Sequence, residues 1–197
     1  MTEAVLTPDR ILDAAEDVLR RFGPAKATVL DVARALNVSH GSVYRHFKTK
    51  AALRDAVTER WLARVSTRLR EITAAGGDAQ DRLRQWLDTL VECKHRLART
   101  DPELFATYTR LTDETREVVT AHVADLAAQL GRIIADGNDQ GLFAAPDPLL
   151  AGRAVLSATA RFHNPVNIAE WSDPALSADY AAVLDLLLNG LRTGRPE

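Results

Sequence analysis

Apolar side chains recur every three or four residues along most of this chain, which is the spacing of one face of an α-helix. Ile11, Ala15 and Val18 show the pattern in its first segment. Glycine and proline fall mainly between the periodic segments, and no segment alternates apolar and polar residues for long enough to predict a sheet. The sequence therefore predicts an all-α fold of about nine helices.

Breaks in this periodicity set the expected helix bounds. Thr7 can cap the first helix and Pro8 suits its first position, whereas the pair at 23–24, Gly-Pro, ends it. The Gly-Gly pair at 76–77 is the clearest break in the chain. The expected helices cover roughly residues 8–22, 28–36, 39–47, 50–73, 79–98, 102–108, 112–136, 148–163 and 177–191.

Length and composition are those of a soluble globular protein: 197 residues, 46% apolar and 26% charged. The only cysteine, Cys93, can form no intrachain disulfide, which fits a reducing compartment. Residues 1–10 lack the apolar core of a signal peptide, and no apolar run approaches the roughly 20 residues that span a bilayer. We therefore expect a cytoplasmic protein without a membrane partner.

The charge is unevenly distributed. The net charge is −2, but residues 20–54 hold eight basic residues and a single acid, Asp31, for a net +7. The rest of the chain then carries −9. A basic stretch on an acidic body indicates a nucleic-acid footprint, although a solvated basic face would give the same count.

Residues 28–50 read TVLDVARALNVSHGSVYRHFKTK and predict two short helices joined by a tight turn at residues 37–38. This is the plan of a helix-turn-helix, whose second helix fits the major groove of double-stranded DNA. The start of that helix reaches base edges, and here it consists of Ser39, His40, Gly41 and Ser42. Tyr44 follows, with a hydroxyl that suits a phosphate or a base edge, and the side chains of Arg45, His46, Lys48 and Lys50 suit phosphate oxygens.

Apolar residues of the same segment predict how the two short helices pack. Leu30, Ala33 and Leu36 are expected on the inner face of the first helix. Val43 and Phe47, four residues apart, are expected to pack on them from the second. An alternative interpretation is that Tyr44 and His46 also serve only to pack this small domain.

The segment closely resembles the DNA-binding signature of the TetR/AcrR family of bacterial regulators. The matching run is Tyr-Arg-His-Phe-Lys-Thr-Lys at 44–50 followed by Leu53, and Phe22-Gly23 and Thr28 match as well. The specific resemblance covers residues 11–53, and the remainder resembles the family in being helical and of suitable length. It implies phosphate contacts by Thr28, Tyr44, His46 and Lys50, and base contacts by His40, Gly41, Ser42 and Arg45.

The resemblance implies two domains, which we place at residues 1–50 for DNA binding and 51–197 for effector binding and dimerisation. A homodimer would let two recognition helices read two half-sites about 34–36 Å apart. The last two long helices are the expected contact and would form a four-helix bundle with their partners. The residues expected there are Leu149, Val155, Tyr180, Val183, Leu184, Leu187, Leu188 and Leu191. An ordinary core stripe is the alternative for each of them.

The middle helices would then hold a small-molecule effector, because ligand pockets are apolar with a few placed polar groups. The candidates are Trp86, Cys93, Phe105, Tyr108, His122, Phe162, His163 and Trp171, with plain core packing as the alternative. His95, His122 and His163 have no ligand partner three or four residues away, so we expect no metal.

The function that fits these features is a ligand-responsive transcriptional regulator, which leaves operator DNA when an effector binds. Two alternatives are a helical enzyme and a protein-binding module with a decayed DNA-binding domain. The sequence has no Gly-rich phosphate loop, no GxSxG and no pair of metal ligands on one helix face, so we expect no catalytic residue and no cofactor. Repression is the commoner case in the family, and activation stays open.

Overall fold

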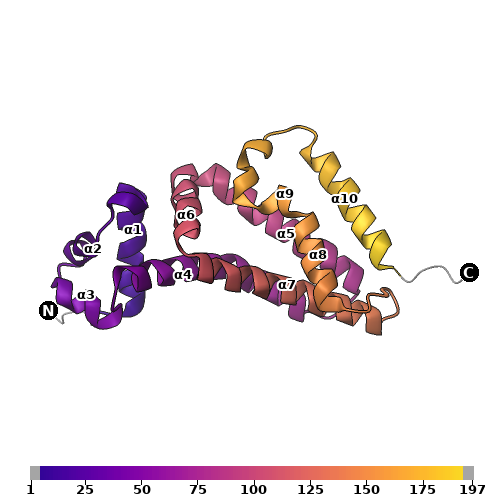
Figure 1. Cartoon of the computed structure of the whole chain (residues 1–197), viewed down its shortest axis with the longest axis horizontal. Helices are drawn as coiled ribbons and strands as arrows, with labels where there is room; N and C mark the ends of the chain where they lie inside the picture. Colours follow the sequence, from indigo (N-terminus) through magenta and orange to yellow (C-terminus); the bar gives the residue numbers. More distant parts are fainter. Residues whose placement is uncertain (1–4, 193–197) are drawn as a thin grey trace, which may run out of the picture. The chain divides into compact units, whose positions relative to one another are not determined.

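The computed structural model describes residues 5–192, apart from the side chain of residue 113. Within these residues the chain forms ten α-helices and one 3-10 helix and no β-strand, which confirms the all-α prediction (Figure 1). The segments are α1 (Pro8–Lys26), α2 (Val29–Ala35), α3 (His40–His46), α4 (Lys50–Ala74), α5 (Ala79–Thr100), α6 (Pro102–Glu114), α7 (Arg116–Asp139), α8 (Pro148–Ala158), α9 (Ala160–His163), η1 (Pro165–Glu170) and α10 (Leu176–Leu191).

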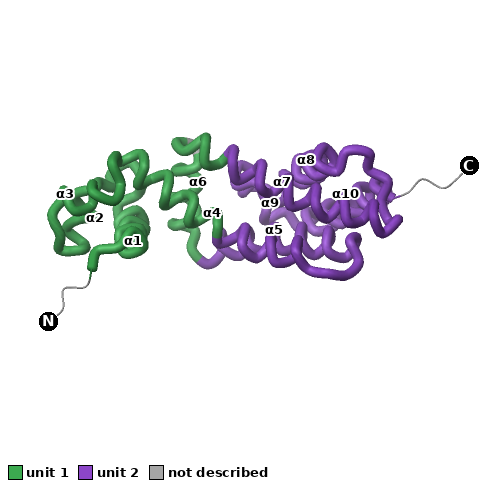
Figure 2. Tube along the Cα trace, turned by 90° about the horizontal axis from the view of Figure 1, so that it is seen from below, with its two compact units in different colours: residues 1–63, 101–119 green, residues 64–100, 120–197 purple. Residues whose placement is uncertain are grey.

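The chain folds into two compact units (Figure 2). The first consists of residues 1–63 and 101–119, and the second of residues 64–100 and 120–197. Both α4 and α7 therefore contribute residues to both units. The predicted functional division at residue 50 stays a prediction.

The start of the first unit follows local sequence signals. Thr7 Oγ1 accepts a hydrogen bond from the backbone N–H of Arg10 at 3.3 Å and so caps α1. Regular helix ends as predicted at Gly23, whose φ of 71° is a left-handed conformation that suits glycine, and a further turn runs to Lys26. Ile11 in α1 and Val43 in α3 are fully buried in the core of this unit.

The inner face of α2 differs by one residue from the expected one. Val29, Val32 and Ala33 are buried, whereas 44% of Leu30 is exposed, so its predicted inward position is wrong. Helical spacing is compatible with an inner face that includes either Val29 or Leu30. Packing against the rest of the unit buries Val29. Leu36 is half-buried.

The apolar core of the second unit is formed mainly by α5, α7, α8 and α10 with the end of α4. Trp86 is fully buried there, and its indole N–H donates to Gln129 Oε1 at 3.1 Å. Helices α7 and α8 approach closely at Gly152, where a Cβ atom would lie 2.6 Å from the carbonyl oxygen of Ala127. A glycine is required at this position because the neighbouring atoms belong to the backbone.

Several helix bounds in the second half of the chain differ from the predictions. α6 runs to Glu114 rather than ending near residue 108, and the break before α7 lies at Thr115, whose φ and ψ are −114° and 51°. The expected helix at 148–163 is divided at Thr159 into α8 and α9. The stretch expected to be irregular, 163–177, contains the 3-10 helix η1.

By length and composition alone, α7 is apolar enough to cross a membrane, contrary to the expectation that no run approaches this length. The core helices of soluble proteins meet the same criterion. Leu130, Ile133 and Ile134 of α7 are fully buried in the core of the second unit, which accounts for its composition.

Candidate DNA-binding site

Helix α2 begins with a complete capping box, as predicted. The backbone N–H of Asp31 donates to Thr28 Oγ1 at 3.2 Å, and the backbone N–H of Thr28 donates to Asp31 Oδ2 at 3.1 Å. The Thr28 hydroxyl also donates to this carboxylate at 2.6 Å, and these hydrogen bonds lower the pKa of Asp31. The single acid of the basic stretch is thus engaged in holding α2.

The turn between α2 and α3 depends on Asn37, whose φ is 53°. Asparagine tolerates this left-handed conformation better than most residues with a side chain. The backbone N–H of Val38 then donates to the carbonyl of Ala33 at 3.0 Å. The predicted tight turn is therefore closed by backbone bonds and leads directly into α3.

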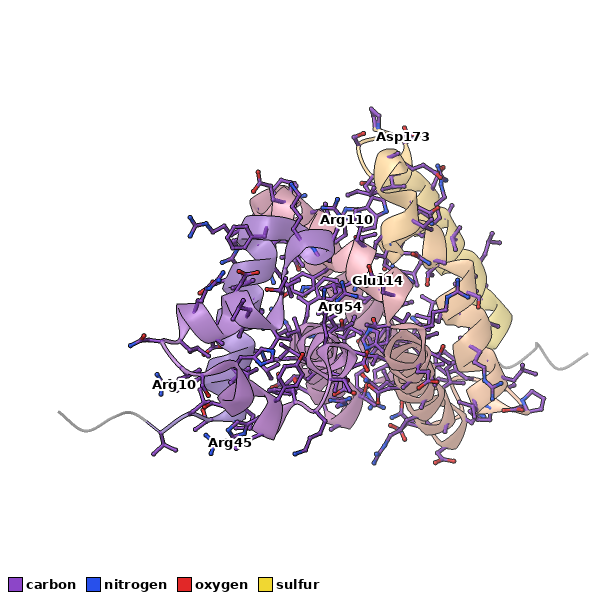
Figure 3. The ribbon with its side chains drawn as sticks, turned by 60° about the vertical axis from the view of Figure 1, so that its left-hand side comes forward. Arg10, Arg45, Arg54, Arg110, Glu114 and Asp173 are labelled. Carbon is purple, nitrogen blue, oxygen red and sulfur yellow. The ribbon has the colours of Figure 1, made fainter. Side chains whose placement is uncertain are left out.

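Three polar side chains of the recognition segment form a connected set. Ser39 caps α3 by accepting a hydrogen bond from the backbone N–H of Ser42 at 3.1 Å, and the two hydroxyl oxygens are 2.8 Å apart. Arg45 Nη2 donates to Ser42 Oγ at 3.2 Å. Arg45 is exposed at the surface, so this bond orients a guanidinium that solvent and DNA can reach (Figure 3).

The opposite face of α3 anchors it. Val43 is fully buried and Phe47 is half-buried, which confirms their inward positions. Tyr44 is half-buried and its ring meets that of His40 edge-on at 4.5 Å, whereas His46 is exposed. The alternative that His46 only packs the domain does not fit this exposure.

Basic side chains surround this exposed face. Lys48 and Lys50 are exposed, and Thr49 Oγ1 caps α4 by accepting from the backbone N–H of Ala52 at 2.9 Å. Among the side chains that the structure describes, no carboxylate forms an ion pair with Arg45, Lys48 or Lys50. Their charges are therefore available to phosphate groups.

The remaining residues predicted for DNA are also accessible. Thr28, Ser39, His40 and Gly41 are exposed, and Ser42 is half-buried. A Cβ atom at Gly41 would meet only Ser39 Oγ, at 3.8 Å. Packing within the chain therefore does not require glycine here.

The predicted effector residues divide between the two units. Phe105 and Tyr108 lie in the first unit, where Tyr108 stacks on Trp61 at 4.4 Å. The other six lie in the second unit: Trp86, Cys93, His122, Phe162, His163 and Trp171. A small hollow of about 30 Å³ lies between α1, α2 and α4, and no predicted effector residue lines it.

His95, which was considered only as a metal ligand, connects two of the predicted effector residues. Its Nε2 lies 2.9 Å from the carbonyl oxygen of Phe162, and its ring stacks on Trp171 at 4.4 Å. Phe162 in turn meets the ring of Tyr180 edge-on at 5.2 Å. His95, Phe162, Trp171 and Tyr180 are thus linked by contacts within the second unit.

A buried lysine between Cys93 and His95 was missed. Only 6% of Lys94 is exposed, and burial lowers its pKa to about 8. A signal was present, because Lys94 falls in helical register with Leu87 and Leu90, both fully buried.

Two profiles of known families match the sequence. The profile of the bacterial regulatory proteins of the tetR family matches residues 11–57. The profile of the tetracyclin repressor-like C-terminal domain matches residues 79–184, more than half of the chain. The chain belongs to the TetR family.

Curated TetR-type relatives are transcriptional regulators rather than enzymes. The HTH-type transcriptional regulator Rv1255c of Mycobacterium tuberculosis (strain ATCC 25618 / H37Rv) is 33% identical over 104 residues, 53% of this chain and 50% of that protein. The repressor KstR2 of Rhodococcus jostii (strain RHA1) is 32% identical over 82 residues, 42% of this chain and 40% of that protein. The chain thus spans about half the length, or less, of the curated relatives it matches.

Solved structures share the TetR fold over nearly the whole chain. SmeT, the repressor of the Stenotrophomonas maltophilia multidrug efflux pump SmeDEF, gives a TM-score of 0.71 at 22% identity, covering 98% of this chain and 94% of that one. A SmeT–triclosan complex gives a TM-score of 0.69 at 21% identity, covering 95% of this chain and 92% of that one. TetR-family regulators bind operator DNA and small-molecule effectors.

The residues predicted for a TetR-type dimer contact differ in exposure. Val155, Leu184 and Leu188 are buried in the core of the second unit. Leu149 is 42% exposed, and the rest are half-buried: Tyr180, Val183, Leu187 and Leu191. Two leucines beside them that the prediction did not include, Leu150 and Leu186, are 59% and 73% exposed.

Proposed function

We propose that this chain is a cytoplasmic repressor that binds operator DNA as a homodimer and is released when a small molecule binds its second unit. The observation that carries this proposal is the exposed polar and basic face of α3 and the start of α4. That face is anchored by buried Val43 and carries Arg45, Lys48 and Lys50 without acidic partners among the described side chains. KstR2 and SmeT are repressors, and SmeT forms a complex with the small molecule triclosan, which supports repression and the binding of a small molecule.

The proposed DNA contacts follow from position and chemistry. Thr28, Tyr44, His46, Lys48 and Lys50 contact phosphates, which set the register of α3 in the major groove. Ser39, His40, Gly41, Ser42 and Arg45 lie at base edges, and the Ser42 hydroxyl orients Arg45. Arginine reads guanine through O6 and N7, so Arg45 is the residue that we assign to a guanine.

The proposed homodimer uses the apolar side chains that α8 and α10 leave accessible. Leu149 and Leu150 in α8 and Leu186 in α10 are exposed, and an interface between two copies would remove their apolar surface from water. Of the predicted contact residues, Val183, Leu187 and Leu191 are half-buried and able to reach a partner. Buried Val155, Leu184 and Leu188 would support this surface from within.

Binding of the purified protein to its own upstream DNA tests the proposal. Fluorescence anisotropy at several salt concentrations should show sequence-selective binding that weakens steeply as salt rises, because phosphate contacts release counterions. A small molecule that binds the protein should then lower the affinity for DNA, by about 5-fold to 150-fold for a typical coupling. If the upstream DNA is not bound, a selection of protein-bound fragments from the whole genome extends the search to distant operators. Recovery of no specifically bound fragment would contradict the proposal.

A further inference from the structure

Three polar side-chain pairs join α4 to α7 inside the second unit. Their closest atoms are 3.2, 2.8 and 3.5 Å apart, and their members are 56, 55 and 56 residues apart in the sequence. Because this separation is nearly constant, the two helices run parallel here in one register. We call these residues the α4–α7 seam: Ser66 with His122, Arg70 with Asp125, and Thr73 with Gln129.

Gln129, only 6% exposed, joins the seam to the core of the second unit. Its Nε2 donates to Asp125 Oδ2 at 2.9 Å, and its Oε1 accepts from the indole N–H of Trp86 on α5 at 3.1 Å. The contact of Gln129 with Thr73 is the weakest of the seam, because the hydroxyl has one proton and also donates to a carbonyl of its own helix at 2.9 Å. The α7 side of the seam is thus held from the core.

The charged pair of the seam forms in one register of the two helices. Moving α4 along α7 by one helical turn places Arg70 opposite Gln129 in one direction and opposite His122 in the other. Arg70 loses its carboxylate partner in both cases. The side chains of Arg70 and Asp125 are 55% and 35% exposed, so their ion pair contributes little to the free energy of unfolding. The pair therefore specifies the register of α4 more than it stabilises the fold.

The register of α4 bears on DNA binding because of where this helix begins. α4 is one continuous helix of 25 residues, Lys50–Ala74, which starts directly after the recognition segment. A shift of its second half along α7 is therefore carried along the helix to its first half. A dimer binds its operator only when two recognition helices have the separation of the two half-sites. The apparent Kd for the operator rises in proportion as the fraction of protein in that arrangement falls.

We infer that the α4–α7 seam fixes the register of α4 in the state that binds operator DNA, and that loss of the seam lowers the fraction of protein in that state. Ser66 and Arg70 are then positioning residues, which act on operator affinity from the second unit. The inference rests on the proposed function, in which the chain binds operator DNA as a homodimer.

Exchange of the two charges tests the inference on the full chain, by fluorescence anisotropy with the DNA fragment that the wild type selects. Arg70→Asp and Asp125→Arg should each weaken binding by about 5-fold to 150-fold, the range of typical couplings, and the double variant should recover most of the lost affinity. Arg68→Asp is the matched control, because Arg68 is exposed on another face of α4 and the change of charge is the same. It should bind like the wild type. An equal loss in Arg68→Asp, or no recovery in the double variant, overturns the inference.

Ser66→Ala tests the seam without any change of charge. The Ser66 side chain is buried, and alanine removes only its hydroxyl, so the packing of α4 is kept. This variant should also weaken operator binding, by about 5-fold or more. Affinity equal to that of the wild type in both Ser66→Ala and Arg70→Asp overturns the inference.

A measurement without DNA distinguishes failure of this inference from failure of the proposed function. Amide hydrogen exchange in residues 64–74 should be faster in Arg70→Asp than in the wild type and slow again in the double variant, with Arg68→Asp like the wild type. If exchange is faster in Arg70→Asp but operator affinity is unchanged, the inference is overturned and the proposed function stands. If the wild type selects no DNA, the proposed function has failed, and equal exchange in all these proteins then overturns the seam as well.

Discussion

Arg54 on α4 forms an ion pair with Glu114, the last residue of α6, and also donates a hydrogen bond to the carbonyl of Pro24 in α1 at 2.8 Å (Figure 3). One guanidinium thus joins three helices of the unit that carries the recognition segment. Because α4 begins directly after that segment, this contact holds the start of α4 in place.

Replacing Arg54 by methionine should lower the free energy of unfolding by about 1–2 kcal/mol, because the carbonyl of Pro24 and the carboxylate of Glu114 lose their partner. Urea denaturation measures this change. Arg34→Met is the matched control, since Arg34 pairs with Asp31 while its side chain is 70% exposed, and it should change stability by less than about 0.5 kcal/mol. Equal losses in both variants would contradict the role of Arg54.

Arg45 should determine sequence preference rather than general affinity. Arg45→Ala should cost about 1–3 kcal/mol on the native operator and relax the preference at one base pair, whereas Lys50→Ala should weaken all sequences alike. Ser42→Ala removes the hydroxyl that Arg45 contacts and should relax the same base pair to a smaller extent. Binding to a set of operators with single base-pair changes measures both effects, and a uniform loss in Arg45→Ala would count against base readout.

Stability should fall as pH drops from 7 to 5. Burial and the nearby Lys94 lower the pKa of His122 and His163 to about 4, compared with about 6.5 in the unfolded chain. The unfolded state therefore binds more protons between these values, so the stabilisation is complete above pH 6.5 and is lost as pH falls toward 4. His122→Gln should reduce the loss between pH 7 and pH 5 by about 1–2 kcal/mol in urea denaturation. An unchanged pH dependence in His122→Gln would contradict this prediction.

Two glycines of the second unit should respond to alanine in opposite directions. A Cβ atom at Gly152 would lie 2.6 Å from backbone atoms of Ala127 and Gly131, so Gly152→Ala should lower the free energy of unfolding by about 1–3 kcal/mol. Gly190 in α10 has no atom within 4 Å of the same position, and Gly190→Ala should be neutral or stabilise by up to about 1 kcal/mol. Thermal unfolding that ranks the two variants the other way would contradict the close packing of α7 on α8.

The features that the sequence predicted best are those determined by neighbouring residues. The capping box of Thr28 and Asp31, the end of regular helix at Gly23 and the cap at Ser39 all depend on groups within a few residues. Such contacts have fixed spacings, so they can be predicted without knowledge of the tertiary structure. The same local contacts fix the bounds of the helices in the DNA-binding segment. That segment is therefore the part of the chain that the sequence predicts most accurately.

Features that depend on tertiary packing could not be predicted in the same way. Leu30 and Val29 fit helical spacing equally well, and only the neighbours of α2 decide which is buried. Tyr108 was grouped with Trp86 because both are aromatic residues in amphipathic helices, yet they belong to different units. For Lys94 two local signals disagree. Its helical register with buried Leu90 favours a buried position, whereas its charge favours the surface. Lys94 is buried, so only the tertiary structure decides between the two signals.

The most direct test of the account is the salt dependence of operator binding in Lys50→Ala compared with Lys26→Ala. Both lysines are exposed in the first unit, but only Lys50 belongs to the proposed DNA-binding face. The account predicts weaker binding and a slope of log affinity against log salt reduced by about 1 for Lys50→Ala, with Lys26→Ala like the wild type. Wild-type affinity and slope in Lys50→Ala, or an equal loss in both variants, would contradict it.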